Sequence, residues 1–247
     1  MPLRICILEA DDMHPQLQPH FHSFGQMFVR LLGSQGRAAS FEIYNVVRGE
    51  YPANPALYDA FLVTGSKADS FGSDTWIVRL REYLLIRYRA GDVLLGVCFG
   101  HQILALVLGG LTERAAQGWG VGVHSYRMLQ MPVNGLAQPS RLHMLISHRD
   151  QVTRLPEQAH LLASSDFCPN AAFMLDGRVL CFQGHPEFTH DFSRSLLQIR
   201  QGIYTPEFYA RGLDSLQHEH DGQIVGGWMI EFVARARQQR AAGSHRD

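Results

Sequence analysis

The stretch that decides the fold is Val93-Leu94-Leu95-Gly96-Val97-Cys98-Phe99-Gly100-His101-Gln102, residues 93–102. Its first five residues are apolar, which is typical of a strand buried on both faces of a sheet. A helical pattern follows from Ile103 to Leu108. Cys98 stands at the junction, with a glycine two residues away on either side. This small-x-nucleophile-x-small form predicts a tight strand-to-helix turn that carries a reactive side chain.

The predicted turn would activate Cys98 in two ways. It projects the sulfur above the sheet at a helix N-terminus, where free N–H groups and the positive end of the helix dipole favour thiolate over thiol. It also points the backbone N–H of Phe99 toward the place where an oxyanion would form. The alternative is a buried cysteine that lies between glycines by chance. The strand before Cys98 and the helix after it favour the reactive turn.

A partner for the sulfur is predicted far along the chain. The strand-like run Val179 to Gln183 leads into Gly184-His185-Pro186-Glu187-Phe188. A carboxylate two residues after a histidine can hold one ring nitrogen while the other nitrogen faces the sulfur. Such pairs are common by chance, so this interpretation depends on the turn at Cys98. Together the two motifs predict a catalytic triad of Cys98, His185 and Glu187, assembled by tertiary contact.

The pattern of apolar residues predicts an α/β fold. Buried strands separated by helices indicate a parallel sheet with both faces covered. From about Gly118 short strand-like pieces dominate, and Asp176-Gly177 predicts a hairpin turn. We therefore expect one open, mostly parallel sheet flanked by helices, with a small additional antiparallel β element. The predicted elements of the first half are strands at 3–8, 41–46, 60–63 and 93–97 and helices at 21–32, ended by Gly33, and 77–88.

The chain of 247 residues fits a single domain. A helical pattern from Asp191 to Arg237 follows the last strand-like piece, and no repeat or long linker divides the sequence. We expect one domain over residues 1–240 and a disordered tail at 241–247.

Composition excludes several classes of function. The formal net charge is −1, and no block of basic residues suggests a nucleic-acid partner. No apolar run is long enough to span a bilayer, and the N-terminus lacks a signal-peptide pattern. We therefore expect a cytoplasmic protein that binds neither nucleic acid nor membrane.

Metal and cofactor sites are not predicted. The four cysteines form no CxxC pair, and the 13 histidines include no HExxH motif. The glycine-rich segment around Trp119 lacks the spacing of a nucleotide-binding loop, and we interpret it as a turn near the rim of the active site. Lys67 and Asp69 are either solvated loop charges or residues of the active-site rim, and we favour the first interpretation. Neither a metal nor another cofactor is expected.

The motifs resemble those of class I glutamine amidotransferases, the group with a Cys-His-Glu triad. The resemblance is carried by Gly-Val-Cys-Phe-Gly-His-Gln at 96–102 and Gln-Gly-His-Pro-Glu-Phe at 183–188. Leu-Ile-Ser-His-Arg-Asp-Gln-Val at 145–152 and Ala-Ser-Ser-Asp-Phe-Cys-Pro-Asn-Ala-Ala at 163–172 are similar to segments of the glutaminase part of GMP synthetase. The resemblance extends over most of residues 3 to about 190.

The resemblance implies a reaction and further site residues. Cys98 would attack the γ-carboxamide of a glutamine-like small molecule, and water would hydrolyse the resulting γ-glutamyl thioester. The oxyanion would be held by the N–H of Phe99 and by Gly65, in the loop Thr64-Gly65-Ser66. Gln102, Ser147 and Asp150 match positions that contact substrate in relatives.

Two departures leave the substrate open. Synthetase-linked members usually read Gly-Gly-Pro in the oxyanion loop, whereas this chain reads Gly65-Ser66-Lys67-Ala68-Asp69 and resembles stand-alone γ-glutamyl peptidases more closely. Arg149 stands where the synthetase-linked members often carry glycine, and it could bind a carboxylate of a larger substrate. The hypotheses are a hydrolase of glutamine or γ-glutamyl amides, a glutaminase subunit that supplies ammonia to a synthetase partner, and a non-catalytic binding protein.

Overall fold

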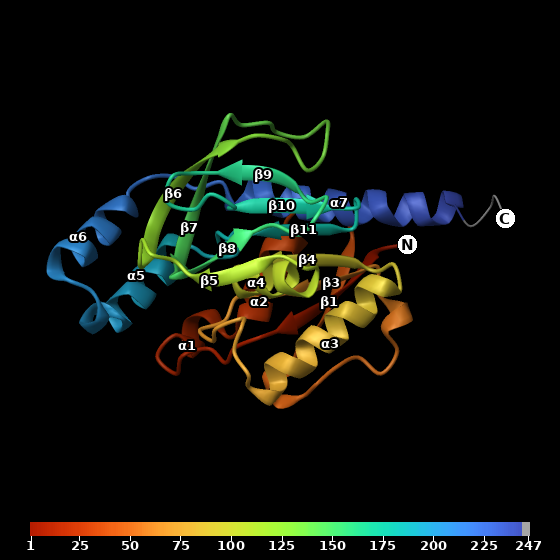
Figure 1. Cartoon of the computed structure of the whole chain (residues 1–247), viewed down its shortest axis with the longest axis horizontal. Helices are drawn as coiled ribbons and strands as arrows, with labels where there is room; N and C mark the ends of the chain where they lie inside the picture. Colours follow the sequence, from red (N-terminus) through yellow and green to blue (C-terminus); the bar gives the residue numbers. More distant parts are fainter. Residues whose placement is uncertain (244–247) are drawn as a thin grey trace.

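The computed structural model describes residues 1–243 and shows an α/β arrangement (Figure 1). The strands are β1 (Leu3–Glu9), β2 (Ala39–Asn45), β3 (Ala60–Val63), β4 (Val93–Val97), β5 (Leu111–Arg114), β6 (Gly120–Met128), β7 (Arg141–His148), β8 (Asp150–Arg154), β9 (His160–Ser164), β10 (Ala172–Leu175) and β11 (Val179–Phe182). The helices are α1 (Gln18–Phe21), α2 (Phe24–Gly33), α3 (Thr75–Arg89), α4 (Phe99–Val107), α5 (His190–Ile199), α6 (Pro206–Ser215) and α7 (Gly222–Gly243). Of the expected tail at 241–247, residues 241–243 belong to α7, and the rest lies outside the described residues.

One nine-stranded sheet carries the fold, in the order β2-β1-β3-β4-β11-β10-β9-β6-β7. The strands from β2 to β11 in this order are parallel, and the remaining neighbours are antiparallel. Strands β5 and β8 form a separate antiparallel pair. The predicted α/β class, with a helix-flanked sheet and a small additional antiparallel element, is confirmed. The predicted hairpin turn is also present between β10 and β11, with positive φ at Asp176 and Gly177.

Both faces of the inner parallel strands β1, β3, β4 and β11 are buried, which explains their largely apolar sequences, whereas the edge strand β2 is partly exposed. In β1, Leu3, Ile5 and Ile7 join a core cluster with residues of α2 and α7. Cys6 and Leu8, which alternate with them, join a second cluster with residues of α3 and α4. Figure 1 shows α3 on one side of the sheet and α7 on the other. The helices therefore hold the parallel strands from both faces.

The structure corrects two boundaries of the predicted helices. The expected helix from Phe21 begins instead at Phe24, because His22 has a φ of 66° and Ser23 caps the helix by accepting the Gln26 N–H at 3.2 Å. The helical pattern from Asp191 to Arg237 is divided into α5, α6 and α7. Strands β5 and β8 were not predicted, because Leu-Thr-Glu-Arg and Asp-Gln-Val-Thr-Arg each contain only one apolar residue.

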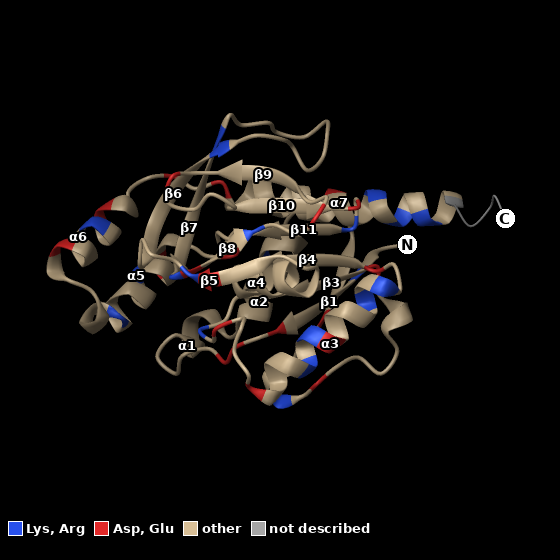
Figure 2. Ribbon diagram, viewed as in Figure 1, with Lys and Arg blue, Asp and Glu red and all other residues tan. Residues whose placement is uncertain are grey.

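Charged residues of both signs lie on α3, α5, α6 and α7, whereas α4 and the inner strands β3, β4, β10 and β11 carry none (Figure 2). Basic residues recur along α3 and near the end of α7, and acidic residues lie on the same helices. Within residues 1–243, no helix combines the length and apolar character needed to cross a membrane.

Candidate active site

The predicted site residues meet at the carboxyl ends of three neighbouring parallel strands. Gly65 follows β3, Cys98 follows β4, and His185 lies beyond the end of β11. A Cβ built on Gly65 would lie 2.7 Å from Cε1 of His185 and 3.6 Å from Cβ of Cys98. Residues distant in the sequence are thus brought into one contact at the edge where α/β folds commonly bind ligands.

Cys98 occupies the strained turn that the sequence predicts. Its φ is 53° and its ψ is −103°, a conformation that residues other than glycine rarely adopt. A Cβ on Gly96 would lie 2.5 Å from the carbonyl oxygen of Gly100, and a Cβ on Gly100 would lie 2.2 Å from that of Val63. The two glycines therefore allow the close approach of strand and helix on which the turn depends.

His185 is fixed on three sides. Its Nδ1 lies 2.8 Å from Oε1 of Glu187, and its backbone N–H donates to the carbonyl of Leu145 at 2.8 Å. Its ring stacks on Phe188 with a centroid separation of 3.7 Å and an interplanar angle of 10°. Because Glu187 holds Nδ1, the other ring nitrogen is left for Cys98.

The electrostatics of this group favour a protonated imidazole. Burial alone would lower the pKa of His185, but the negative charges of Glu187 and Cys98 and the hydrogen bonds to both outweigh it and raise the pKa to about 10. An imidazolium beside the sulfur stabilises a negative charge there. The arrangement can hold a negatively charged sulfur beside a protonated His185 ring.

A pocket opens above Cys98. Twelve residues line it: Ser66, Lys67, Ala68, Asp69, Cys98, Gln102, Trp119, Ser147, His148, Arg149, Asp150 and Arg200. All four predicted substrate contacts, Gln102, Ser147, Arg149 and Asp150, are among them. Lys67 and Asp69 also line the pocket, which places them at its rim, although their side chains are 68% and 43% exposed. The placement of Trp119 near the rim is confirmed.

Two arginines flank Trp119 in the pocket. The guanidinium carbons of Arg149 and Arg200 lie 5.5 and 5.7 Å from the centre of the Trp119 ring. Arg200 donates to Ser147 Oγ at 2.9 Å, and neither arginine forms an ion pair with a described carboxylate. Arg200 was not predicted, because it lies at the end of α5 in a segment without a motif. Two unpaired cations beside one ring favour an anionic group on the ligand.

The pocket also carries acidic groups. Arg114 donates to Asp150 Oδ1 at 3.2 Å and to both carboxylate oxygens of Asp69 at 3.1 Å. Burial and the neighbouring Asp69 raise the pKa of Asp150, and Arg114 opposes this rise. Gln102 is buried, and its side-chain amide donates to the Asp150 carbonyl at 2.7 Å. The pocket therefore combines cationic and acidic side chains around one sulfur.

No metal centre accompanies these residues. Among the described side chains, no three or more of the types His, Cys, Asp and Glu are grouped so that they could hold a metal ion.

Comparison with known proteins identifies the family. The model of the class I glutamine amidotransferase family matches residues 69–198, which include Cys98, His185 and Glu187. Gamma-glutamyl peptidase 2 of Arabidopsis thaliana is 30% identical over 210 residues, 83% of this chain and 83% of the relative. Gamma-glutamyl peptidase 3 of the same plant is 34% identical over 179 residues, 69% of this chain and 71% of the relative.

A solved structure has the same fold. The crystal structure of a glutamine amidotransferase from Thermotoga maritima superposes with a TM-score of 0.71 at 18% identity, covering 94% of this chain and 99% of that one. The chain belongs to the class I glutamine amidotransferase family, as an enzyme of the cysteine-hydrolase type that acts on C–N bonds.

Proposed function

We propose that this protein hydrolyses the γ-glutamyl amide bond of glutamine or of a γ-glutamyl compound through a thioester on Cys98. The observation that carries the proposal is the arrangement of three groups around the sulfur of Cys98. Cys98 stands on a strained turn, His185 lies beside it across Gly65, and Glu187 holds Nδ1 of the His185 ring. This arrangement of nucleophile, base and orienting carboxylate is typical of cysteine hydrolases.

The proposed reaction uses each group in turn. The Cys98 thiolate adds to the γ-carbonyl carbon, and the N–H groups of Phe99 and Gly65 bind the oxyanion. The tetrahedral intermediate expels the amine, which takes the proton of the His185 imidazolium. Neutral His185 then removes a proton from water, which attacks the thioester and releases the γ-carboxylic acid with the regenerated thiolate. The acid then loses its proton to solvent, and the imidazolium is restored. Glu187 keeps the ring oriented in both steps.

The pocket supports a substrate with charges of both signs. A γ-glutamyl group carries an α-ammonium and an α-carboxylate, which the carboxylates of Asp69 and Asp150 and the guanidinium groups of Arg149 and Arg200 complement. A γ-glutamyl peptide carries a further carboxylate on its leaving group, and two unpaired guanidinium groups can bind two carboxylates. We therefore favour γ-glutamyl peptides over glutamine. Two relatives are named gamma-glutamyl peptidases, which agrees with this choice.

A second candidate is a glutaminase subunit that passes ammonia to a separate synthetase. The similarity of residues 145–152 and 163–172 to the glutaminase part of GMP synthetase favours it. In that case glutamine hydrolysis would rise when a synthetase partner binds.

A substrate screen tests the proposal. Purified protein is incubated with glutamine, γ-glutamyl dipeptides and glutathione, and released ammonia or amine is measured. We expect turnover of at least one γ-glutamyl peptide and its loss in Cys98→Ala. Absence of turnover in the wild type, or equal turnover in Cys98→Ala, contradicts the proposal.

A further inference from the structure

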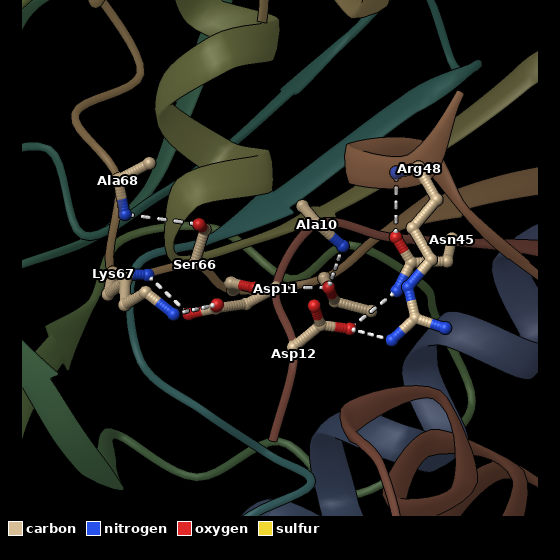
Figure 3. Close-up of polar contacts among 10 residues, drawn as sticks. Ala10, Asp11, Asp12, Asn45, Arg48, Ser66, Lys67 and Ala68 are labelled. Carbon is tan, nitrogen blue, oxygen red and sulfur yellow. Dashed lines mark hydrogen bonds and ion pairs between the residues drawn. The ribbon is translucent and has the colours of Figure 1, made fainter. Parts of the chain in front are cut away.

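The loop after β3 is held by the loop after β1. These strands are parallel neighbours, so their carboxyl ends lie side by side. The N–H of Thr64 donates to the carbonyl of Leu8 at 3.2 Å, and the N–H of Ala10 donates to Thr64 Oγ1 at 3.0 Å. Figure 3 shows the two loops facing each other, with Asp11 directed at Lys67. The link between them lies next to Gly65, which contacts the Cys98 and His185 pair.

Asp11 binds Lys67 twice. Its Oδ2 accepts the backbone N–H of Lys67 at 2.8 Å, and its Oδ1 accepts the side-chain ammonium at 2.8 Å. The Asp11 side chain is 11% exposed, whereas that of Lys67 is 68% exposed. An exposed ammonium adds little to an ion pair, whereas a largely buried carboxylate that accepts a main-chain N–H forms a strong, directed bond. The backbone bond is therefore the part that fixes the loop.

The neighbouring peptide groups are also fixed. The carbonyl of Thr64 accepts the Gly100 N–H at 3.2 Å, and the carbonyl of Gly65 accepts the Thr64 hydroxyl at 3.1 Å. The Thr64 carbonyl shares a peptide group with the N–H of Gly65, and the Gly65 carbonyl shares one with the N–H of Ser66. In a planar trans peptide the N–H and the carbonyl point in opposite directions, so both N–H groups are turned away from these partners. Neither N–H has an acceptor within residues 1–243. They remain available to a ligand.

We propose that Asp11 is a positioning residue, which sets the backbone from Gly65 to Lys67 so that its free N–H groups bind the oxyanion formed at Cys98. This inference rests on the hydrolysis proposed above. A proline at position 67, as in the Gly-Gly-Pro loops of similar chains, would restrict the backbone through its ring and would have no N–H. Lys67 has an N–H and an unrestricted φ. Asp11 both satisfies that N–H and supplies the missing restraint.

Steady-state kinetics of Asp11 variants test the role, with the adjacent Asp12 as a matched control. Asp12 binds Asn45 at 3.0 Å and Arg48 at 2.8 Å, on the other side of the loop (Figure 3). We expect Asp11→Ala to lower kcat by at least about 10-fold, with KM changed by less than about 2-fold, because oxyanion contacts act in the transition state. Asp11→Asn should lose less, because its amide oxygen can still accept the Lys67 N–H. Asp12→Ala should retain the wild-type kcat.

A second measurement separates positioning from a general structural defect. Cys98 is labelled with a γ-glutamyl chloromethyl ketone, whose carbonyl oxygen gains negative charge as sulfur adds, and with iodoacetamide, which forms no oxyanion. We expect Asp11→Ala to slow the first reaction by at least about 10-fold and to leave the second within about 2-fold. Equal slowing of both reactions, or an unchanged rate with the ketone, overturns the inference. Failure of the proposed function would show separately, as absence of γ-glutamyl turnover in the wild type.

Discussion

Nδ1 of His185 lies 2.8 Å from Oε1 of Glu187, and the two side chains are only 4% and 0% exposed. Burial opposes charge on the ring, yet the nearby Glu187 and Cys98 raise the pKa of His185 to about 10. The imidazole therefore keeps its proton across the neutral range. Since Glu187 holds Nδ1, the remaining ring nitrogen can donate its proton toward the sulfur and the leaving amine.

Glu187→Gln should shift the alkaline limb of the pH profile. The wild type should lose activity as pH rises through about 10, where His185 loses the proton that the leaving amine needs. Removing the carboxylate charge removes one cause of the raised pKa, so the limb should move to lower pH, with kcat reduced on the order of 10²-fold or more. The measurement is kcat/KM against pH for both proteins. An unmoved limb would contradict this assignment.

Gly65→Ala should impair catalysis without unfolding the protein. The added Cβ would lie 2.7 Å from Cε1 of His185, whose ring is held by Glu187 and Phe188 and has little room to move. Displacing the ring should lower kcat/KM on the order of 10²-fold. Gly202→Ala is the control, because a Cβ there meets nothing within 4 Å. Wild-type kinetics for Gly65→Ala would contradict the contact.

Arg149→Gln and Arg200→Gln should reduce the preference for substrates with a carboxylate on the leaving group. A charge-assisted hydrogen bond is worth about 1.5–3 kcal/mol, so kcat/KM for a γ-glutamyl dipeptide should fall roughly 10- to 150-fold. The same dipeptide with a C-terminal carboxamide should be affected less. Arg194→Gln, an exposed position on α5, is the control. Equal losses on both substrates would instead place the arginines at the α-carboxylate.

Acid should destabilise the protein through His101. Burial lowers the pKa of this histidine from 6.5 to about 3, so below pH 6.5 the unfolded chain binds the proton first and the folded state loses stability. The free energy of unfolding should fall by about 1.4 kcal/mol per pH unit from this group between these values. His101→Gln should show a shallower fall in urea titrations, whereas exposed His218→Gln should match the wild type. Parallel curves for His101→Gln and the wild type would refute the assignment.

The sequence was most informative where function restricts the backbone locally. The apolar run before Cys98 and the glycines at positions 96 and 100 specify strand, turn and helix within ten residues, because each constraint lies close in sequence. The Asp176-Gly177 hairpin was predictable for the same reason. His185 and Glu187 became interpretable only in combination with Cys98.

Residues supplied by other elements were harder to predict. Arg200 reaches the pocket from the end of α5, and no spacing or neighbour distinguishes it in the sequence. Asp11 closely follows β1, at the edge where the carboxyl ends of parallel strands meet. A carboxylate in that position is a candidate site residue from the sequence alone. The pairing of Asp69 with Arg114 depends on β5, a strand with a single apolar residue and therefore no recognisable pattern. These positions are determined by tertiary packing, which local patterns do not encode.

Direct detection of the covalent intermediate tests the central claim. A γ-glutamyl substrate is mixed with the enzyme, the reaction is quenched in acid, and the peptide containing Cys98 is analysed by mass spectrometry. We predict a γ-glutamyl adduct on Cys98 that accumulates in wild type and is absent in Cys98→Ala. Substrate turnover in the wild type without any adduct on Cys98, together with undiminished turnover in Cys98→Ala, would contradict the thioester mechanism.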